Sequence, residues 1–255
     1  MSSTIKLLSA KLLSSFRRGG LVGLLKRSVM EVEEIRFDRK FGIDTRGTFT
    51  ECAIPAGYDR NLYVGYGPTK IRTLREIFRE LPVSFENFIF LDLGSGKGRT
   101  LLVASEFPFR RIIGVEFSPE LHSIAKKNIR AYRSTTQKCS VIESYCCDAT
   151  LYRMPSENTV LFLYNPFKSP IVSQVLTNLR ESLRSHPRQV YLVYHNPVCH
   201  ELIVRSGLLE VVRVTKSCSI YKNRTLVSGN PIPAIDDSAD KGISETRDPI
   251  RLEIT

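Results

Sequence analysis

The sequence predicts an α/β protein with a doubly wound, mainly parallel seven-stranded sheet, an antiparallel end to that sheet, and an N-terminal helical extension. Strand-like apolar segments alternate with helix-like amphipathic segments between residues 61 and 225. This alternation is typical of a parallel sheet that carries helices on both faces. The last two strand-like segments, residues 208–214 and 218–223, have no helix between them, which predicts an antiparallel pair.

The predicted core begins with a helix at residues 69–81, because Ile71, Leu74 and Phe78 recur at the spacing of one helical face. Apolar strands and further helices are expected to follow it in alternation. The strands are predicted at residues 88–94, 110–117, 139–149, 159–167 and 188–197, and the helices at 98–107, 118–132, 169–183 and 198–207.

The helix at residues 118–132 has the clearest start signal in the chain. Ser118 is a good N-cap, Pro119 suits the first turn, and Glu120 lies near the positive end of the helix dipole. The helix at residues 169–183 opens with the same Ser-Pro pair. Both starts follow directly after predicted strands, as crossover helices do.

Composition divides the chain into three parts. Residues 1–60 are predicted to be a basic accessory segment, and residues 61–225 the main domain. Residues 226–255 are rich in Pro, Ser, Asp and Gly, which predicts a flexible C-terminal tail.

The first 30 residues carry six Lys or Arg residues before the first acid, Glu31. Three interpretations stay open: a basic amphipathic helix that rests on a membrane surface or a partner, an organelle transit peptide, and a short helix packed on the domain. No apolar run reaches about 18 residues, so a membrane span is not expected. The expected location is cytoplasmic, with peripheral membrane contact or organelle targeting as the alternatives.

The formal net charge of +11 favours acidic partners such as nucleic acid, although a solvated basic surface explains it equally simply. The six cysteines form no CxxC pair, and no His lies at metal-ligand spacing from them. We therefore expect a reducing compartment and no bound metal.

The segment FLDLGSGKGRTLL, residues 90–102, places a glycine-rich loop between a buried strand and a helix. A nucleoside triphosphate loop is excluded, because Lys97 is followed by Gly98 rather than by Ser or Thr. A dinucleotide loop fits poorly, because Arg99 stands where its third glycine is needed. What remains is an acid, Asp92, followed by glycines at alternate positions.

This pattern resembles the first motif of the class I S-adenosylmethionine-dependent methyltransferases, which have a Rossmann-like fold. The resemblance covers roughly residues 60–222 and includes the segments GVEFSPEL and NPF. The chain is most similar to bacterial methyltransferases of unassigned substrate, and more distantly to Dot-type histone lysine methyltransferases and to the lysine methyltransferases of the ATP-synthase ring. S-adenosylmethionine is the cofactor that the resemblance implies.

The resemblance implies a role for each strand end. The glycine loop would pass close to the cofactor, and Asp92 would order the loop or a water near the methionine amino group. Glu116 would accept both ribose hydroxyls, and Asp148 would lie near the adenine amino group. The cofactor-binding residues that follow from these roles are Asp92, Gly94, Ser95, Gly96, Gly98, Glu116, Phe117, Asp148 and Ala149.

The segment GYGPTK, residues 65–70, precedes the first core helix. In the methyltransferases that this chain resembles, the corresponding segment often closes over the cofactor. Tyr66, Pro68 and Thr69 are therefore candidates for such a lid. The alternative is a turn in which Thr69 is the N-cap of the helix.

Asn165, Pro166 and Phe167 end the fourth predicted strand and are the candidates for the reaction centre. In amino-group methyltransferases a longer motif accepts the N–H groups of the target and stacks an aromatic ring on a planar substrate. This chain has only one proline in the motif, which weakens a claim to adenine, cytosine or glutamine as the target. The alternative is that Pro166 ends the strand and Phe167 packs in the core.

Three charged or polar residues near the site stay unassigned. Lys97 and Arg99 flank the loop and face the cofactor carboxylate, an acidic neighbour or solvent. His195 ends the fifth strand beside Asn196 and Pro197, either as a general base or as a wall residue without a role in the reaction.

The leading hypothesis is transfer of a methyl group to an amino or hydroxyl group of a protein, such as a lysine, or of a small molecule. The second is a nucleic-acid methyltransferase, motivated by the net charge. The third is a binding module that keeps the fold without catalysis.

Overall fold

The computed structural model describes residues 31–48, 59–62, 65–215 and 217–224. The expectations for residues 1–30 and for the tail at 226–255 lie outside this part of the chain. In the described part, no helix is long and apolar enough to cross a membrane.

The sheet has seven strands in the order β3-β2-β1-β4-β5-β7-β6, and β1 to β5 are parallel. β7 is antiparallel to both of its neighbours, which confirms the predicted antiparallel end. The strands are β1 (Ile89–Leu93), β2 (Ile112–Glu116), β3 (Ile142–Cys146), β4 (Thr159–Tyr164), β5 (Val190–His195), β6 (Leu209–Val214) and β7 (Cys218–Asn223).

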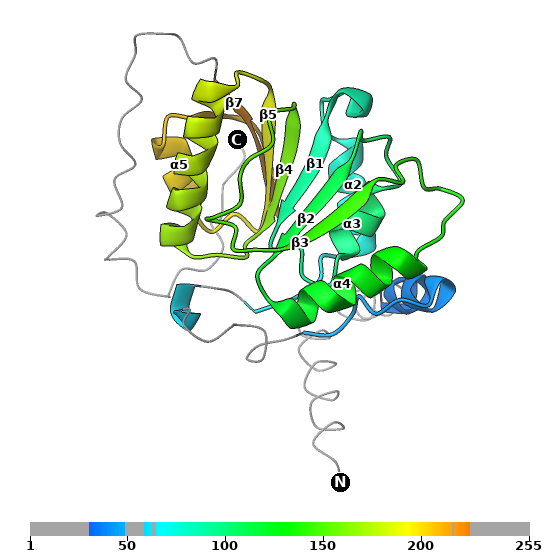
Figure 1. Ribbon diagram of the computed structural model, residues 1–255. Coiled ribbons are helices and arrows are strands. Elements are labelled where there is room, and N and C mark those ends of the chain that lie inside the picture. The colour runs from blue at the N-terminus through cyan, green and yellow to red at the C-terminus, as the bar shows by residue number, and fades with distance from the viewer. Residues whose placement is uncertain (1–30, 49–58, 63–64, 216, 225–255) are drawn as a thin grey trace, which may run out of the picture.

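Helices cover both faces of the sheet, and Figure 1 shows α5 on one side with α2 and α3 on the other. α4 lies against β2 and β3. The α-helices are α2 (Ile71–Arg79), α3 (Arg99–Ala104), α4 (Pro119–Ala131), α5 (Ser169–Ser185) and α6 (His200–Arg205), and short 3₁₀ turns are η1 (Arg60–Leu62) and η2 (Phe85–Asn87).

The core has two layers because the central strands bury side chains on both faces. In β1, Ile89 and Leu91 pack on the side of α5, and Phe90 points to the other side. There its ring meets that of Phe78 from α2 edge-on, with 5.3 Å between ring centroids. A central parallel strand is apolar in both directions for this reason.

Residues 31–41 form a helix that packs on the α2 side of the sheet. Phe37 is buried in the core layer that contains α2 and α3. Phe41 lies with its ring centroid 4.5 Å from that of Tyr132, which follows α4. The N-terminal segment therefore shares the hydrophobic core of the main sheet.

The helix starts agree in part with the sequence. Ser118 is the N-cap of α4, and its hydroxyl accepts a hydrogen bond from the Leu121 amide at 3.4 Å. The alternative of Thr69 as N-cap of α2 is wrong, because Lys70 holds that position and makes no side-chain cap. Glu34 supplies the cap instead, since its Oε1 accepts from the Ile71 amide at 3.0 Å.

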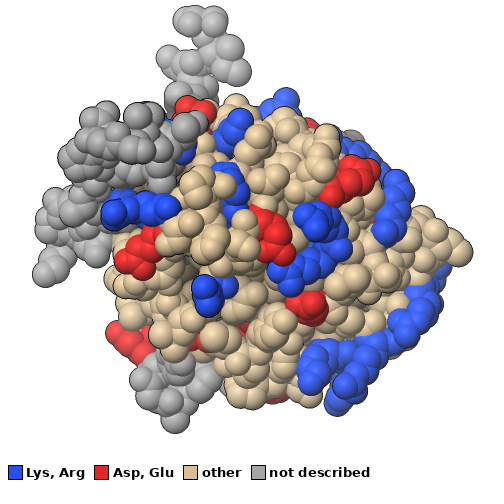
Figure 2. Space-filling view, turned by 45° about the horizontal axis from the view of Figure 1, so that its top comes forward, with Lys and Arg blue, Asp and Glu red and all other residues tan. Residues whose placement is uncertain are grey.

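Basic residues are exposed on two helices of the described chain, the one at residues 31–41 and α4. Arg36, Arg39 and Lys40 are exposed on the helix at residues 31–41, and Lys126, Lys127 and Arg130 on α4. Figure 2 shows Lys and Arg spread over the face that it draws and gathered along its lower right edge, with acids between them. Positive charge is thus exposed on both helices.

Candidate functional site

The glycine loop after β1 is held by β2 on one side. The amides of Gly94 and Ser95 both donate to the carbonyl of Val115, at 2.8 and 3.0 Å. Gly94 has φ +86°, and a Cβ there would lie 2.7 Å from the Pro166 side chain. Gly96 has φ +54°, and a Cβ there would lie 2.2 Å from the ring of Tyr66. The lid segment and the NPF segment both touch the loop where it lacks side chains.

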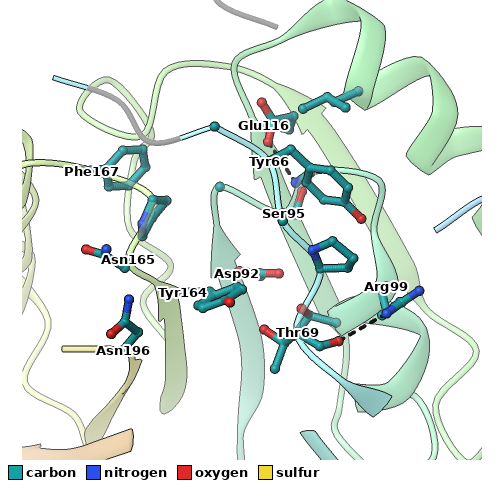
Figure 3. A pocket seen from close by; sticks show the side chains of 18 of the residues that line it. Tyr66, Thr69, Asp92, Ser95, Arg99, Glu116, Tyr164, Asn165, Phe167 and Asn196 are labelled. Atoms are coloured by element: carbon teal, nitrogen blue, oxygen red, sulfur yellow. Dashed lines mark hydrogen bonds between the residues drawn. The ribbon is translucent and has the colours of Figure 1, made fainter. Parts of the chain in front are cut away.

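A cavity of about 170 Å³ opens at the carboxyl ends of β1, β2 and β4. Figure 3 shows Glu116, Tyr66 and Ser95 on one side of it and Asn165, Phe167 and Asn196 on the other. It is lined by Gly65, Tyr66, Gly67, Pro68, Thr69, Asp92, Gly94, Ser95, Gly96, Arg99, Thr100, Glu116, Phe117, Leu121, Tyr164, Asn165, Pro166, Phe167 and Asn196.

Most of the predicted cofactor-binding and reaction-centre residues line this cavity, but Gly98, Asp148 and Ala149 do not. Gly98 caps α3 in the left-handed conformation. A Cβ at Gly98 would lie 3.2 Å from Ala125. Asp148 turns its Oδ1 to the amide and hydroxyl of Thr150, at 2.7 Å each, and Ala149 is buried beside it. Roles for Asp148 and Ala149 in adenine binding stay predictions.

Glu116 ends β2 with its carboxylate buried at 4% exposure. Its Oε2 accepts from the Gly96 amide at 2.8 Å, and its Oε1 accepts from the Ser118 amide at 2.9 Å. Burial raises the pKa of Glu116, and these backbone amides act in the opposite direction. Each oxygen keeps a lone pair for a further donor, so the group can hold the loop and still accept from a diol.

Asp92 lies within β1, one residue before its end, and is buried. The pKa of Asp92 is raised to about 8, mainly by burial and also by the negative charge of Glu116, while a hydrogen bond from Thr100 acts in the opposite direction. Two carboxyl groups whose pKa values are both raised line one small cavity. Such a cavity favours a ligand that brings positive charge or hydrogen-bond donors.

Stability should fall as the pH rises from about 4 to about 8, through the raised pKa of Asp92. In this window the folded protein keeps the proton, while the unfolded chain, with its ordinary pKa of 3.8, releases it. Asp92→Asn should therefore gain free energy of unfolding relative to the wild type as the pH rises. Urea unfolding at pH 5 and at pH 8 measures this. Glu120→Gln, at an exposed carboxylate, is the control, and an equal gain in both variants would contradict the assignment.

A buried polar network joins the N-terminal segment to the start of α3. The Arg99 guanidinium forms an ion pair with Glu34, and both side chains are 3% exposed. Its Nε also donates to the Thr45 hydroxyl at 2.8 Å, and that hydroxyl donates to Asp38 at 2.6 Å. Arg99 thereby connects residues 31–48 to the end of the glycine loop.

Lys97 makes a second connection of the same kind. Its Nζ lies 2.9 Å from both carboxylate oxygens of Asp44 and 2.8 Å from the Arg46 carbonyl. Asn128 of α4 donates to the carbonyls of Lys97 and Asp44. Of the three environments left open for Lys97 and Arg99, the acidic neighbour is the one observed for both.

The opposite wall of the cavity is neutral and polar. Asn165 has φ +39°, and its Oδ1 accepts a hydrogen bond from the Tyr194 hydroxyl at 3.3 Å. Phe167 is only 4% exposed and belongs to the core layer that contains α5. The Phe167 ring is therefore packed in the core, while the Asn165 carboxamide remains beside the cavity.

His195 is not among the residues that line the cavity. Its ring lies 4.6 Å, centroid to centroid, from that of Tyr164. Burial lowers the pKa of His195, and a hydrogen bond to the Ser217 backbone acts against it. The His195 ring thus approaches the cavity only through its contact with Tyr164, and both roles considered for it stay predictions.

Three buried polar atoms at the cavity have no hydrogen-bond partner within the described residues: Thr69 Oγ1, Ser95 Oγ and Arg99 Nη2. Buried polar atoms are rarely left unpaired, so atoms of this kind in a cavity wall indicate a polar ligand. Together with Asp92 and Glu116 they offer both donors and acceptors.

Sequence reasoning missed several contributors to this site. Tyr164 lines the cavity, and its place directly before Asn165 at a strand end was the available signal. Glu34, Asp38 and Thr45 gave no such signal, because their partners lie far away in the chain.

A family model described as histone methylation protein DOT1 matches residues 56–184 of this chain. A comparison with curated proteins found no match.

Similar solved structures include an RNA methyltransferase from Salinibacter ruber in complex with S-adenosyl-L-homocysteine, at 20% identity and TM-score 0.41, covering 66% of this chain and 99% of that one. Magnesium protoporphyrin IX methyltransferase from Synechocystis PCC 6803 with bound SAM matches at 11% identity and TM-score 0.45, covering 60% and 77%. Ribosomal protein L11 methylase from Lactobacillus delbrueckii subsp. bulgaricus matches at 13% identity and TM-score 0.44, covering 66% and 84%.

Proposed function

Because this chain belongs to the DOT1 family and is an S-adenosylmethionine-dependent methyltransferase with a Rossmann-like fold, we propose that it methylates a lysine side chain of a protein. The observation that carries the choice of acceptor is the neutral wall formed by Tyr164, Asn165 and the buried Phe167. That wall offers hydrogen-bond acceptors, while the Phe167 ring is packed in the core and the Tyr164 ring lies 4.6 Å, centroid to centroid, from that of His195.

The residues around the cavity fit S-adenosylmethionine. Its ammonium group suits Asp92, whose raised pKa of about 8 would otherwise keep it protonated near neutral pH, and its ribose hydroxyls suit the Glu116 carboxylate. The unpaired atoms of Thr69, Ser95 and Arg99 suit its carboxylate and hydroxyl groups. When bound, the cofactor supplies a methyl group that its sulfonium already makes electrophilic.

The acceptor wall can bind and orient an amine. The Oδ1 of Asn165 accepts a hydrogen bond from the Tyr194 hydroxyl, which fixes the orientation of the carboxamide. The same oxygen has a second lone pair that can accept a hydrogen bond from an N–H of the substrate. A lysine must lose its proton before its nitrogen lone pair can attack. Transfer into a cavity wall of uncharged side chains favours that neutral form.

A planar target, such as a nucleobase, would need an aromatic face against which to stack. Phe167 stands at the position of that aromatic residue in the longer motif, but its ring is packed beside Gly94 and Pro166. This arrangement supports an aliphatic amine over a base. The exposed basic helices keep nucleic acid as the alternative acceptor to be tested.

Incubation with methyl-labelled S-adenosylmethionine tests the proposal, with core histones, a whole-cell protein extract and total RNA as separate acceptors. We expect label in protein, released as methyl-lysine after acid hydrolysis. Label in RNA, with RNA binding that weakens between low and moderate salt, would favour the nucleic-acid alternative. Label in neither macromolecule but in the small-molecule fraction would refute a protein acceptor.

Asn165→Gly should lower kcat by roughly 10- to 100-fold, because a hydrogen-bond acceptor in the cavity wall is lost while glycine keeps the left-handed backbone. S-adenosylhomocysteine affinity, measured by calorimetry, should stay within about twofold, since the Asn165 carboxamide serves the acceptor. Asn87→Gly, at an exposed position before β1, is the control. If Asn165→Gly lost as large a factor in S-adenosylhomocysteine affinity as in kcat, the variant would instead have disturbed the glycine loop.

A further inference from the structure

Two asparagines end neighbouring strands in matching positions. Tyr164 of β4 pairs in register with His195 of β5, so the next residues, Asn165 and Asn196, emerge side by side. Each of them is followed by a proline. Among the described residues they are the only ones other than glycine with positive φ, at 39° and 52°.

The backbone of Asn196 is held in this conformation from both sides. Its amide donates to the Ser217 carbonyl at 2.7 Å, and its carbonyl accepts from the Val198 amide at 2.9 Å. Asparagine is among the few residue types that tolerate left-handed backbone, and strained positions of this kind cluster at functional sites. The turn therefore fixes where the Asn196 side chain begins.

Both carboxamides lie on one wall of the cavity. Figure 3 shows Asn196 beside Asn165, away from Glu116 and Tyr66. Neighbouring strands lie about 4.8 Å apart, a separation that two carboxamides can span to a single small group. Asn165 is already oriented by Tyr194, whereas Asn196 lines the cavity and is exposed, so an acceptor can reach it.

We propose that Asn196 is the second acceptor for the N–H groups of the substrate lysine, and that the pair limits the number of methyl groups transferred. This inference rests on the proposed function. A neutral primary amine has one lone pair and two N–H groups. With the lone pair directed at the methyl carbon, one N–H reaches Asn165 and the other reaches Asn196.

The count of N–H groups sets the preference. In each transfer the nitrogen lone pair forms the bond to carbon, the carbon–sulfur bond leaves its electron pair on sulfur, and the product ammonium releases a proton to solvent. Monomethyl-lysine has one N–H left and leaves one carboxamide oxygen without a donor, which is unfavourable. The wild type should therefore add the first methyl group faster than the second.

The test compares wild type, Asn196→Gly and the control Asn87→Gly on core histones and on extract protein, with mono-, di- and trimethyl-lysine followed by mass spectrometry over time. Asn196→Gly keeps the left-handed backbone and removes the carboxamide. It should slow the first methylation and raise the ratio of the second rate to the first by about tenfold. An unchanged ratio, with methyl-lysine still formed, overturns the inference and leaves the proposed function standing. Absence of methyl-lysine from the wild-type reaction overturns the function itself.

A second measurement needs no turnover. NMR titration of the S-adenosylhomocysteine-bound protein with n-butylamine and N-methylbutylamine should show about tenfold tighter binding of the primary amine by the wild type, and near-equal binding by Asn196→Gly. Equal preference in the two proteins, or binding of neither amine by the wild type, overturns the role of Asn196. The NMR spectrum of Asn196→Gly before the titration establishes that the variant is folded, so that its amine preference can be compared with that of the wild type.

Discussion

Replacement of Glu34 with alanine should lower the free energy of unfolding by about 3–5 kcal/mol. The change leaves the Arg99 guanidinium buried at 3% exposure without its carboxylate. It also removes the acceptor for the Ile71 amide at the start of α2. Removal of one partner of a buried ion pair is costly because the other charge stays in a poorly solvated place.

The matched control is Glu31→Ala in the same helical segment. Glu31 pairs with Lys70 at 3.3 Å, but the two side chains are 60% and 42% exposed. Exposed pairs of this kind contribute about 0–1 kcal/mol. Urea unfolding of both variants should show a large shift of the midpoint for Glu34→Ala alone. Similar small losses of unfolding free energy in both variants would mean that water solvates the Arg99 charge once Glu34 is removed.

Glu116→Ala should weaken the binding of S-adenosylhomocysteine by roughly 1.5–3 kcal/mol, measured by calorimetry. The substitution removes a charged acceptor from the cavity wall. It also leaves the amides of Gly96 and Ser118 without their carboxylate partner, so the loop loses its fixed shape.

Two further variants separate these causes. Glu120→Ala removes an exposed acid four positions later in the first turn of α4, and it should leave the affinity unchanged. Glu116→Gln keeps one oxygen acceptor and should lose less than alanine does. Full affinity in Glu116→Ala would mean that the ribose is held elsewhere.

The parts of the fold that depend on local pattern could be predicted from the sequence. β1 is apolar on both faces, and the glycine loop follows it directly, so strand, turn and helix are encoded within about a dozen neighbouring residues. The acid at the end of β2 follows the loop at a fixed short spacing. The turn at Asn165 could also be predicted locally, because Pro166 follows it directly and ends the strand.

The contacts that complete the site could not be predicted in this way. The Arg99–Glu34 and Lys97–Asp44 pairs join residues that are 65 and 53 positions apart. A charged residue in a short segment reads as surface unless its distant partner is known. The same holds for Asn196, whose place beside Asn165 depends on the register of β4 and β5.

The order of the strands places two separate sets of side chains around this cavity. In the proposed function, the ends of β1 and β2 bind the cofactor, whereas the ends of β4 and β5 bind the acceptor. Mutations that accumulate at the ends of β4 and β5 can redirect the enzyme to a new target during evolution without costing it the methyl donor. Relatives that diverge in this way would keep the glycine loop and differ first at Tyr164-Asn165 and at His195-Asn196.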